Sequence, residues 1–424
     1  MKVNQYLPSW LLGIRMRKSV KEIAAILESN STSMEEVVQT AIDSGEVEKD
    51  SLFFALKGER VDGHQFLEEV AKKGGVAAVV SKAYQGKDFG LELIRVDDVN
   101  RALHFLAKEM FKETKGTVIG VTGTVGKTTT KEFLATVLGE RFRVMKSEAS
   151  LNSQVGLPLT ILNGDLSAEV IVLEMGMSEK GELKRLVDIV HPHIGILTKL
   201  TLVHGNPLEE IAEEKCQLFT SKRMERAFLN EQTASFEPVQ NLTIPKEWFD
   251  KAPGPFTESH LLEAVGAAVA IARYLGMTEK EIERGVQKLK PFDHRFEKIE
   301  KKGALFIDDS YNASPEAVKT ALSNLPKGKR RIALLGAMKE LGPFEVNSHR
   351  EVAEHALPLV DHLLCVGKEC LPMVDVFEKG GKPVELFHEK AEVASRLKEL
   401  VQKEDVVLIK GSNSLKLWTL LEGV

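Results

Sequence analysis

One stretch of this chain, GVTGTVGKTTT at residues 120–130, constrains the fold more than any other. A short run rich in β-branched residues, 117–121, precedes it. After it, apolar residues recur at helical spacing, at Phe133, Leu134, Val137 and Leu138. The glycines therefore lie in a turn between a strand and a helix. In such a turn, backbone N–H groups and the helix dipole converge on one point, which favours a bound phosphate.

This pattern predicts a nucleotide site. Lys127 would reach the β- and γ-phosphates, and the hydroxyl of Thr128 would hold Mg²⁺. The spacing differs from the common phosphate-loop pattern, which would place its first glycine at Val121, because here that glycine is Gly120. We therefore expect a slightly longer loop. The alternative is a glycine-rich turn whose lysine binds nothing.

The composition is that of a soluble globular protein. The chain has 424 residues, of which 43% are hydrophobic and 28% charged, which suits two or three domains. A net charge of −5 gives no general attraction to nucleic acid. Three cysteines are too few for a disulfide framework or a zinc site, and they favour a reducing cytoplasm. The apolar run at residues 10–14 is followed by its basic residues, unlike a signal peptide, and no stretch approaches the ~20 apolar residues of a membrane span.

Hydrophobic patterning divides the chain into three expected α/β domains, at residues 1–115, 116–291 and 292–424. The first domain has a helix-like run and three strand-like runs, at residues 20–27, 50–56, 76–80 and 93–96. A polar loop at residues 57–64 joins two of these strands. Its side chains could hold the diphosphate and sugar of a ligand, or the loop could be ordinary surface.

The second domain contains the glycine-rich turn and two more expected strands, at residues 169–173 and 194–197. Glu174 follows the first of these strands. A carboxylate there is placed to hold Mg²⁺ directly or through water, although it could also be an ordinary acid at a strand end. His204 lies in the loop after the second strand, and a helix is expected at residues 207–219.

Lys215 lies on the apolar stripe of that helix, four residues after Ile211 and three before Leu218. The side chain could extend its amine to solvent. Burial would instead disfavour the ammonium form, and a neutral amine can take up CO₂ as a carbamate. A carbamate is a metal-binding anion, so the residue has two possible roles.

The third domain repeats a strand followed by a helix-like stretch, with strands at residues 304–307, 331–335, 363–366 and 406–409. This repeat predicts a doubly wound, mostly parallel sheet, whose ligand groups lie beyond the carboxyl ends of the strands. The polar residues and the methionine at those ends are Asp308, Asp309, Tyr311, Asn312, Met338, Glu340 and Lys410. The turn at residues 410–412 is expected to open the last helix, where an anion could bind.

Several separated motifs resemble those of the Mur ligase family over nearly the full length of the chain. They are TGTVGKTT at 122–129, NSQVGLP at 152–158, EMG at 174–176, DDSYNASP at 308–315, GAMKELG at 336–342 and KGSNS at 410–414. The last three are similar to the third domain of the members that add D-alanyl-D-alanine. DSLFFALKGERVDGHQF at 50–66 resembles the family's UDP-sugar-binding segment. The DNPR box of the members that add the preceding amino acid is absent.

The resemblance implies a three-domain α/β fold. Its parts would be a small N-terminal UDP-sugar-binding domain, a central P-loop ATPase domain with a parallel sheet, and a C-terminal Rossmann-like domain that binds the incoming dipeptide and closes on ATP. The implied activity is an ATP-dependent acid–D-amino-acid ligase that adds D-alanyl-D-alanine to UDP-N-acetylmuramoyl-tripeptide through an acyl phosphate. This reaction belongs to cytoplasmic peptidoglycan precursor synthesis, and so to cell wall biogenesis, cell shape and cell division. We expect a monomer that binds neither nucleic acid nor membrane.

Two other classes of function stay open. One is a different ligase of the same architecture, such as the enzyme of the preceding, tripeptide-forming step or folylpolyglutamate synthetase. The missing DNPR box and the UDP-type first domain argue against both. The other is a P-loop switch or binding protein. The chain lacks the guanine-reading N-K-x-D of a GTPase, which argues against that class.

The resemblance also assigns site residues. The catalytic residues would be Lys127, Glu174, His204 and Lys215. Two Mg²⁺ ions would be held by Thr128, Glu174, His204 and Lys215, the last as its carbamate. ATP would be contacted by Gly123, Thr124, Val125, Gly126, Lys127, Thr128, Thr129, Arg295 and Asp309. The substrates would be contacted by Asp43, Ser44, Lys57, Asp62, Gly63, His64, Asn152, Tyr311, Asn312, Glu340, Lys410 and Ser412.

Three segments depart from the family pattern. The family's D-[ST]-R reads Asp43-Ser44-Gly45, which removes one expected contact to the uridine nucleotide. The family's H-N-x-x-N-A run near adenine has Leu261 and Ala264 in place of its asparagines, so we expect adenine to be held differently and less selectively. Residues 226–256 are few for the family, so the central domain is expected to be trimmed.

Overall fold

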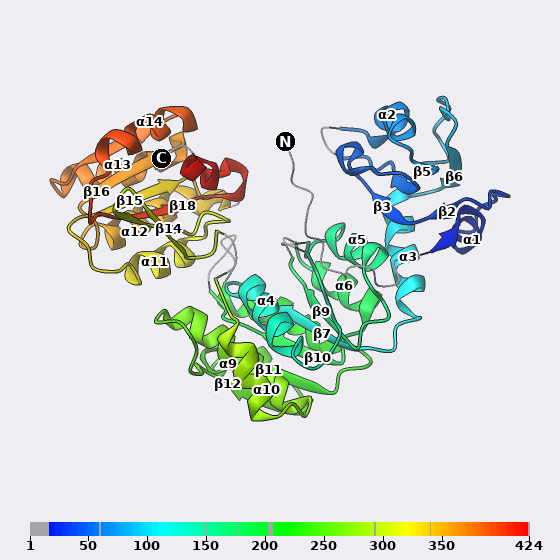
Figure 1. The fold of residues 1–424 in the computed structure, drawn as a ribbon, viewed down its shortest axis with the longest axis horizontal. Helices are drawn as coiled ribbons and strands as arrows, with labels where there is room; N and C mark the ends of the chain where they lie inside the picture. Colours follow the sequence, from blue (N-terminus) through cyan, green and yellow to red (C-terminus); the bar gives the residue numbers. More distant parts are fainter. Residues whose placement is uncertain are drawn as a thin grey trace.

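The computed structural model describes residues 17–58, 61–148, 151–177, 179–201, 207–291, 294–339 and 341–422. Three domains form a crescent, with the central domain at its base and the N-terminal and C-terminal domains on either side (Figure 1). Each domain has its own mainly parallel sheet. Within the described ranges, no helix has the length and apolar character needed to cross a bilayer.

The N-terminal domain is built on a four-stranded parallel sheet in the order β3-β4-β5-β6. Its elements are β1 (Lys18–Ser19), α1 (Val20–Ile26), β2 (Glu36–Val37), β3 (Gln39–Ala41), β4 (Ser51–Phe54), α2 (Leu67–Lys72), β5 (Ala77–Ser81), β6 (Glu92–Val96) and α3 (Val99–Phe111). Side chains alternate along a strand, and in β4 both sets are buried: Leu52 and Phe54 join one apolar cluster, while Phe53 joins another. The sheet is therefore covered on both faces.

The central domain has a six-stranded parallel sheet in the order β12-β11-β10-β7-β9-β8. Its strands are β7 (Thr117–Thr122), β8 (Val144–Lys146), β9 (Val170–Glu174), β10 (Ile194–Leu197), β11 (Arg226–Asn230) and β12 (Lys246–Phe249). Its helices are α4 (Lys127–Leu138), α5 (Gly156–Asn163), α6 (Glu182–Val190), α7 (Leu208–Cys216), α8 (Glu237–Gln240), α9 (Ser259–Tyr274) and α10 (Glu279–Gln287). The carboxyl ends of β7, β9 and β10 meet at one edge, where ligand groups gather in sheets of this type.

The C-terminal domain has a six-stranded sheet in the order β13-β14-β18-β15-β16-β17, in which only β13 is antiparallel. Its strands are β13 (Glu297–Lys301), β14 (Ala304–Asp308), β15 (Arg331–Gly336), β16 (His362–Val366), β17 (Val384–Phe387) and β18 (Val406–Lys410). Its helices are α11 (Pro315–Ser323), α12 (Glu345–Ala356), α13 (Leu371–Lys379) and α14 (Lys390–Leu400). The predicted three-domain α/β fold with parallel sheets is thus confirmed.

Two local predictions are wrong. Gly120 lies inside β7, so it does not lengthen the loop; a Cβ there would stand 2.7 Å from Leu218 Cδ1, which explains the glycine by close packing. The turn itself runs only from Gly123 to Gly126. Residues 410–412 are followed by two short 3₁₀ turns, residues 413–415 and 417–422, and not by an α-helix. They therefore offer no α-helix N-terminus to an anion.

Candidate functional site

The phosphate turn, residues 123–126, is fixed by contacts to neighbouring strand ends. The hydroxyl of Thr198, just after β10, donates to the carbonyl of Val125 at 2.7 Å, and the N–H of Thr124 donates to the carbonyl of Lys199 at 2.8 Å. Gly123 and Gly126 have φ values of 140° and 90°, which favour glycine. A Cβ at Gly123 would also stand 2.0 Å from the Thr198 hydroxyl. Both requirements explain the glycines that were visible in the sequence.

Lys127 begins α4 and folds back over the turn. Its Nζ donates to the carbonyls of Gly123 and Thr124 at 3.0 and 3.1 Å. Burial lowers the pKa of Lys127, while the carboxylate of Glu174 opposes that shift. The lysine charge is thus held at the point where the backbone N–H groups of a phosphate turn would place an anion.

Glu174 ends β9 beside this turn and is almost fully buried. Its Oε1 accepts a hydrogen bond from Asn152 Nδ2 at 2.6 Å. Its Oε2 is buried without a hydrogen-bond partner among the described residues, and the Lys131 ammonium lies 3.9 Å away. A buried carboxylate oxygen that lacks a donor is costly unless a cation satisfies it. Glu174 therefore fits a Mg²⁺ ligand, and Lys131 is a neighbouring cation that the sequence interpretation had not singled out.

Lys215 lies on α7 with only 4% of its surface exposed, so its amine does not extend to solvent. Burial, followed by repulsion from Lys127, lowers the pKa of Lys215 to about 7. A substantial fraction of neutral amine is therefore present near neutral pH. These properties fit a lysine that forms a carbamate. His204, the other residue predicted for this part of the metal site, lies outside the described residues.

Arg295 comes from the segment that leads into the C-terminal domain, yet it contacts the phosphate-binding helix. Its Nη2 donates to the hydroxyl of Thr128 at 3.1 Å, and its guanidinium lies over the ring of Tyr311 at 4.3 Å. Its Nε is buried without a hydrogen-bond partner in the described ranges. The neighbours of Arg295, His294 and Phe296, have positive φ values of 60° and 59°. This backbone conformation is unfavourable for such residues, so surrounding contacts must hold it.

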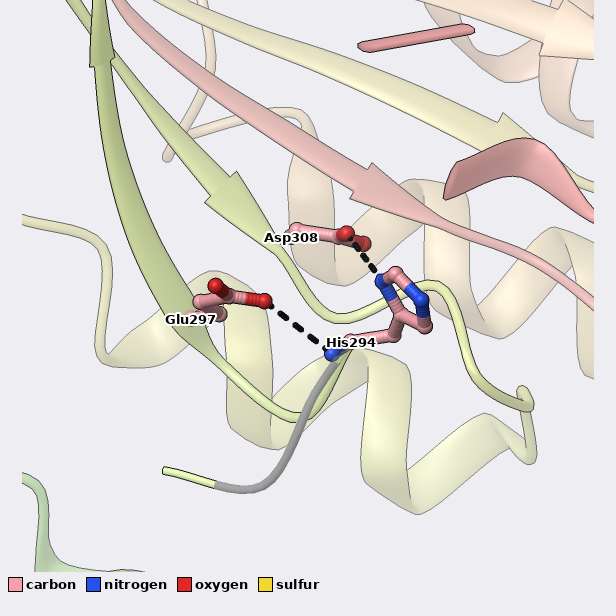
Figure 2. Close-up of side chains that lie close together, drawn as sticks. All are labelled: His294, Glu297 and Asp308. Atoms are coloured by element: carbon pink, nitrogen blue, oxygen red, sulfur yellow. Dashed lines mark hydrogen bonds and ion pairs between the residues drawn. The ribbon is translucent and has the colours of Figure 1, made fainter. Parts of the chain in front are cut away.

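Figure 2 shows one set of those contacts. His294 Nδ1 lies 2.6 Å from Asp308 Oδ2, and the backbone N–H of His294 donates to Glu297 Oε2 at 3.3 Å. The imidazole also stacks on Trp418, with ring centroids 5.0 Å apart. The ligand atoms of His294, Glu297 and Asp308 lie within 4.8 Å of one another, as in a metal site. Because the hydrogen bonds link these groups to each other, we interpret the cluster as the anchor of the interdomain segment.

The residues predicted for the dipeptide site lie at the ends of β14 and β18. Lys410 Nζ forms a 2.7 Å ion pair with Asp309 and donates to the carbonyl of Asn312 at 2.9 Å. The carbonyl of Tyr311 accepts from the side chain of Asn413 at 2.9 Å. The Ser412 hydroxyl lies 3.3 Å from that of Ser414. Lys410 is 3% exposed, and its contacts to Asp309 and Asn312 link the ends of β14 and β18. Glu340 lies outside the described residues.

A pocket lies between the central and C-terminal domains, next to the phosphate turn. It is lined by Val125, Gly126, Thr129, Thr130, Thr198, Lys199, Asn230, Phe249, His260, Glu263, Ala264, Arg295, Phe296, Asp309, Ala317, Thr320, Ala321 and Lys410. Lys199 Nζ and Glu263 Oε1 form an ion pair at 2.8 Å in this pocket, where Ala264 offers no polar group. The sequence interpretation missed this pair. The departure from the family pattern at residues 260–265 was the available signal. It showed that both asparagines are absent, but it did not indicate the ion pair of Lys199 and Glu263.

A second cavity, of about 720 Å³, lies in the N-terminal domain. We call it the N-terminal cavity; it is lined by Ala55, Lys57, Asp62, His64, Gln65, Ser81, Ala83, Tyr84, Gln85, Asp97, Asp98, Val99 and Asn100. Three of the predicted substrate residues, Lys57, Asp62 and His64, are thus brought together. Gly63 lies beside them, with its backbone so close to Leu56 that a Cβ would stand 2.8 Å from that residue's carbonyl oxygen.

His64 is held in one orientation at the cavity wall. Its Nδ1–H donates to Asp62 Oδ1 at 2.6 Å, its Nε2 accepts from the N–H of Ser81 at 3.1 Å, and its ring stacks on Tyr84 at 5.0 Å. The hydrogen bond from His64 lowers the pKa of Asp62. Asp43 and Ser44 do not line the cavity. Asp43 accepts a hydrogen bond from the N–H of Gly45 in the local turn, and Ser44 donates to Glu69 on α2.

Comparison with known proteins identifies similar chains for all three domains. Models of the Mur ligase family catalytic domain, the Mur ligase middle domain and the Mur ligase glutamate ligase domain match residues 36–110, 121–247 and 294–413. The UDP-N-acetylmuramoyl-tripeptide–D-alanyl-D-alanine ligase of Bacillus subtilis (strain 168) is 30% identical over 445 residues. That alignment covers 95% of this chain and 97% of the relative.

Two solved structures are similar over most of the chain. The crystal structure of MurF ligase from Thermotoga maritima in complex with ADP has a TM-score of 0.74 and 28% sequence identity, and it covers 91% of this chain and 96% of that one. Crystal structure I of MurF from Acinetobacter baumannii has a TM-score of 0.82 and 23% identity, and it covers 96% of this chain and 98% of that one. The second similarity concerns the fold alone.

Proposed function

The chain belongs to the Mur ligase family, and on that premise we propose that it joins D-alanyl-D-alanine to UDP-N-acetylmuramoyl-tripeptide with conversion of ATP to ADP and phosphate. The observation that carries the proposal is the 30% sequence identity, over 95% of this chain, to the UDP-N-acetylmuramoyl-tripeptide–D-alanyl-D-alanine ligase of Bacillus subtilis. The segments at residues 308–315 and 410–414 agree with it. Those segments lie at the ends of β14 and β18, next to the pocket that holds the phosphate turn.

The reaction requires two anions to meet. The carboxylate of the UDP-linked tripeptide attacks the γ-phosphorus of ATP, the bond to the β–γ bridging oxygen breaks, and ADP leaves. The amine of D-alanyl-D-alanine then attacks the acyl carbon, loses a proton and displaces phosphate. Lys127 and the phosphate turn would stabilise the charge that develops on the transferred phosphoryl group. Arg295 would move from the Thr128 hydroxyl to the phosphates.

Two Mg²⁺ sites fit the residues present. Thr128 and Glu174 would hold one ion, which is supported by Glu174 Oε2, a buried oxygen without a hydrogen-bond donor among the described residues. His204 and the carbamate of Lys215 would hold the other, which the burial and low pKa of Lys215 support. The ions would offset the repulsion between the reacting anions. Activity that does not depend on divalent cations would contradict this part of the proposal.

The outer domains would hold the two substrates. We assign the uridine end of the acceptor to the N-terminal cavity and the dipeptide to the edge formed by Asn312, Lys410 and Ser412. The corresponding domain boundaries are residues 1–115, 116–291 and 292–424. All three cysteines are free, which suits a protein of the cytoplasm, and we propose that the enzyme acts there as a monomer without nucleic-acid or membrane partners.

Phosphate release with defined substrates tests the proposal. The purified protein, ATP and UDP-N-acetylmuramoyl-tripeptide should release phosphate rapidly with D-alanyl-D-alanine and weakly with L-lysine, diaminopimelate or L-alanyl-L-alanine. A pocket fitted to one methyl direction clashes with its mirror image, so the L,L dipeptide is the matched control. Equal turnover with a single amino acid on a UDP-linked dipeptide would reassign the chain to the preceding step of the pathway.

The carbamate has a separate test. Lys215→Ala should be nearly inactive, and small carboxylic acids should restore part of the activity because they replace the missing metal-binding anion. Lys215→Arg should not be restored, since a guanidinium cannot carry the carbamate. An unmodified Lys215 in bicarbonate-containing buffer, together with no restoration, would remove the carbamate from the mechanism.

A further inference from the structure

One side chain of the central domain pairs with an edge strand of the N-terminal domain. Asn163, the last residue of α5, accepts a hydrogen bond from the N–H of Thr40 through Oδ1 at 2.7 Å and donates to the carbonyl of Thr40 through Nδ2 at 2.9 Å. Thr40 is the middle residue of β3, which lies at the edge of its sheet. The carboxamide therefore satisfies both outward-facing backbone groups of Thr40, as a neighbouring strand would.

The other end of α5 has a second contact to the N-terminal domain. His104 on α3 places Nε2 at 2.5 Å from the carbonyl of Gln154, which lies two residues before the helix begins. The side chain of Gln154 in turn donates to the carbonyl of Glu182 at 2.9 Å. Since α5 has eight residues, it is about 12 Å long, and the two anchors lie at its opposite ends. Two separated anchors fix the direction of a domain as well as its position.

The segment that leads into α5 also contacts Glu174, beside the phosphate turn. Asn152, four residues before α5, donates to Glu174 Oε1 at 2.6 Å, and its carbonyl accepts from the N–H of Gly176 at 2.8 Å. A continuous run of 12 residues, 152–163, thus connects the carboxylate at the end of β9 to the edge of the N-terminal sheet. Apolar side chains also pack across this junction, but apolar contacts are not directional. The hydrogen bonds at the ends of α5 supply the direction.

We propose that Asn163 is a positioning residue for ligation: it sets the orientation of the N-terminal cavity relative to Glu174 and the phosphate turn. This inference rests on the proposed function. A UDP-linked acceptor held in the N-terminal cavity must bring its far carboxylate to the γ-phosphate in the central domain. The distance between those two places is fixed by the junction, and a displacement of about 1 Å in a reacting group can cost roughly 10²-fold in rate.

Asn163→Ala tests this role by separating ligation from binding. The N-terminal cavity and the phosphate turn each lie away from Asn163, so the affinities for UDP and for ATP should stay within about twofold of wild type. The kcat/KM for UDP-N-acetylmuramoyl-tripeptide should fall by roughly tenfold or more. Asn163→Asp keeps the acceptor for Thr40 N–H but places a second carboxylate oxygen against the Thr40 carbonyl, so it should also lower kcat/KM. It carries the same test if the alanine variant does not fold.

Asn241→Ala is the matched control, because Asn241 follows α8 as its C-cap and is exposed. It should leave all three quantities unchanged. An Asn163→Ala protein with wild-type kcat/KM would overturn the proposal. So would a parallel loss of UDP affinity, ATP affinity and ligation, because that pattern indicates general destabilisation.

Two measurements that need no turnover keep this inference separate from the proposed function. Hydrogen exchange at the Thr40 amide should accelerate in Asn163→Ala, and small-angle scattering should show a changed distribution of interdomain distances. If the wild-type protein does not ligate D-alanyl-D-alanine, the proposed function fails, and these two measurements still decide whether Asn163 orients the domain. Unchanged scattering with accelerated exchange would show that it does not.

Discussion

The two outer domains are joined to the central domain in physically different ways. At the N-terminal junction one apolar cluster is continuous, since it includes Leu103 and Leu106 of α3 together with Leu157 of α5 and Leu186 of α6. Among the described residues, the apolar clusters of the C-terminal domain contain no residue of the central domain. The first junction shares a core, whereas the second joins two separate cores.

The polar contacts of the two junctions also differ in kind. The N-terminal junction uses hydrogen bonds of Asn163 and His104 to backbone groups, outside the pocket that adjoins the phosphate turn. The C-terminal junction uses charges: Arg295 contacts Thr128, and Lys298 forms a 2.7 Å ion pair with Glu258. Arg295 lines the pocket itself. A junction built from charges beside a nucleotide site responds to the nucleotide, while a shared apolar core does not. We therefore propose that the C-terminal domain is the one that moves during catalysis.

The largest expected effect on turnover concerns Lys127, which lies in the central domain between the two junctions. Lys127→Ala should lower kcat by about 10²–10³-fold or more, because it removes a charge that stabilises the transferred phosphoryl group. The thermal unfolding temperature and the Thr40 amide exchange should stay near wild type. Steady-state phosphate release and hydrogen exchange measure these quantities. Near wild-type turnover in a folded Lys127→Ala protein would refute the site assignment.

The next effect separates the C-terminal junction from the N-terminal one. Arg295→Ala should lower kcat/KM for ATP by about 10²-fold, since Arg295 lies in the pocket beside Thr128. Arg295→Lys keeps the charge but loses the planar fork and the stacking on Tyr311, so it should recover only part of the activity. Asn163→Ala should leave the affinity for ATP unchanged. Equal effects of Arg295→Ala and Asn163→Ala on ATP binding would erase the distinction between the junctions.

Lys215 gives a pH-dependent effect in the central domain. Its pKa in the folded protein is about 7, below the ~10.4 of an exposed lysine, so the unfolded state binds more protons between these values. The free energy of unfolding should therefore rise with pH above about 7, by at most about 2.7 kcal/mol between pH 7 and pH 9. Lys215→Met should flatten this rise in protein free of metal and bicarbonate. Denaturant unfolding at each pH measures it, and identical slopes for both proteins would show that Lys215 is not desolvated.

The smallest expected effect concerns the anchor of the C-terminal junction. His294→Ala removes a hydrogen bond to the buried Asp308 and the stacking on Trp418, and should cost about 1–3 kcal/mol of stability. Lys298→Ala is the matched control, because its ion pair is half-exposed on the lysine side and should be worth less than about 1 kcal/mol. Denaturant unfolding of the two variants would compare these losses. A larger loss from Lys298→Ala would mean that the charged contact, and not His294, holds the interdomain segment.

The amino-acid sequence by itself determined the strand–turn–helix at residues 117–138, the parallel sheets and the family. These features are local, because β-branched runs, helical spacing and turn glycines are patterns of residues that are close together in the sequence. The length of the phosphate turn was predicted wrongly because Gly120 was assigned to the loop, while packing against Leu218 explains it inside the strand. The predicted last helix was wrong for a related reason, since a turn after a strand does not specify the type of the next element.

Only the tertiary structure decided the contacts between residues that are distant in sequence. Asn163 meets Thr40 and Arg295 meets Thr128 across 123 and 167 positions. No local pattern marks Asn163 and Thr40 as partners, because an asparagine at a helix end has the same immediate neighbours whether or not a domain packs against it. The family resemblance assigned Arg295 and Thr128 to the ATP site, but their direct hydrogen bond came only from the structure. The same holds for the ion pair of Lys199 and Glu263, which lies next to Ala264, one of the two positions where the family pattern has an asparagine. Sequence periodicity determines which residues form each domain, while the packing of one domain on another determines which side chains share a site.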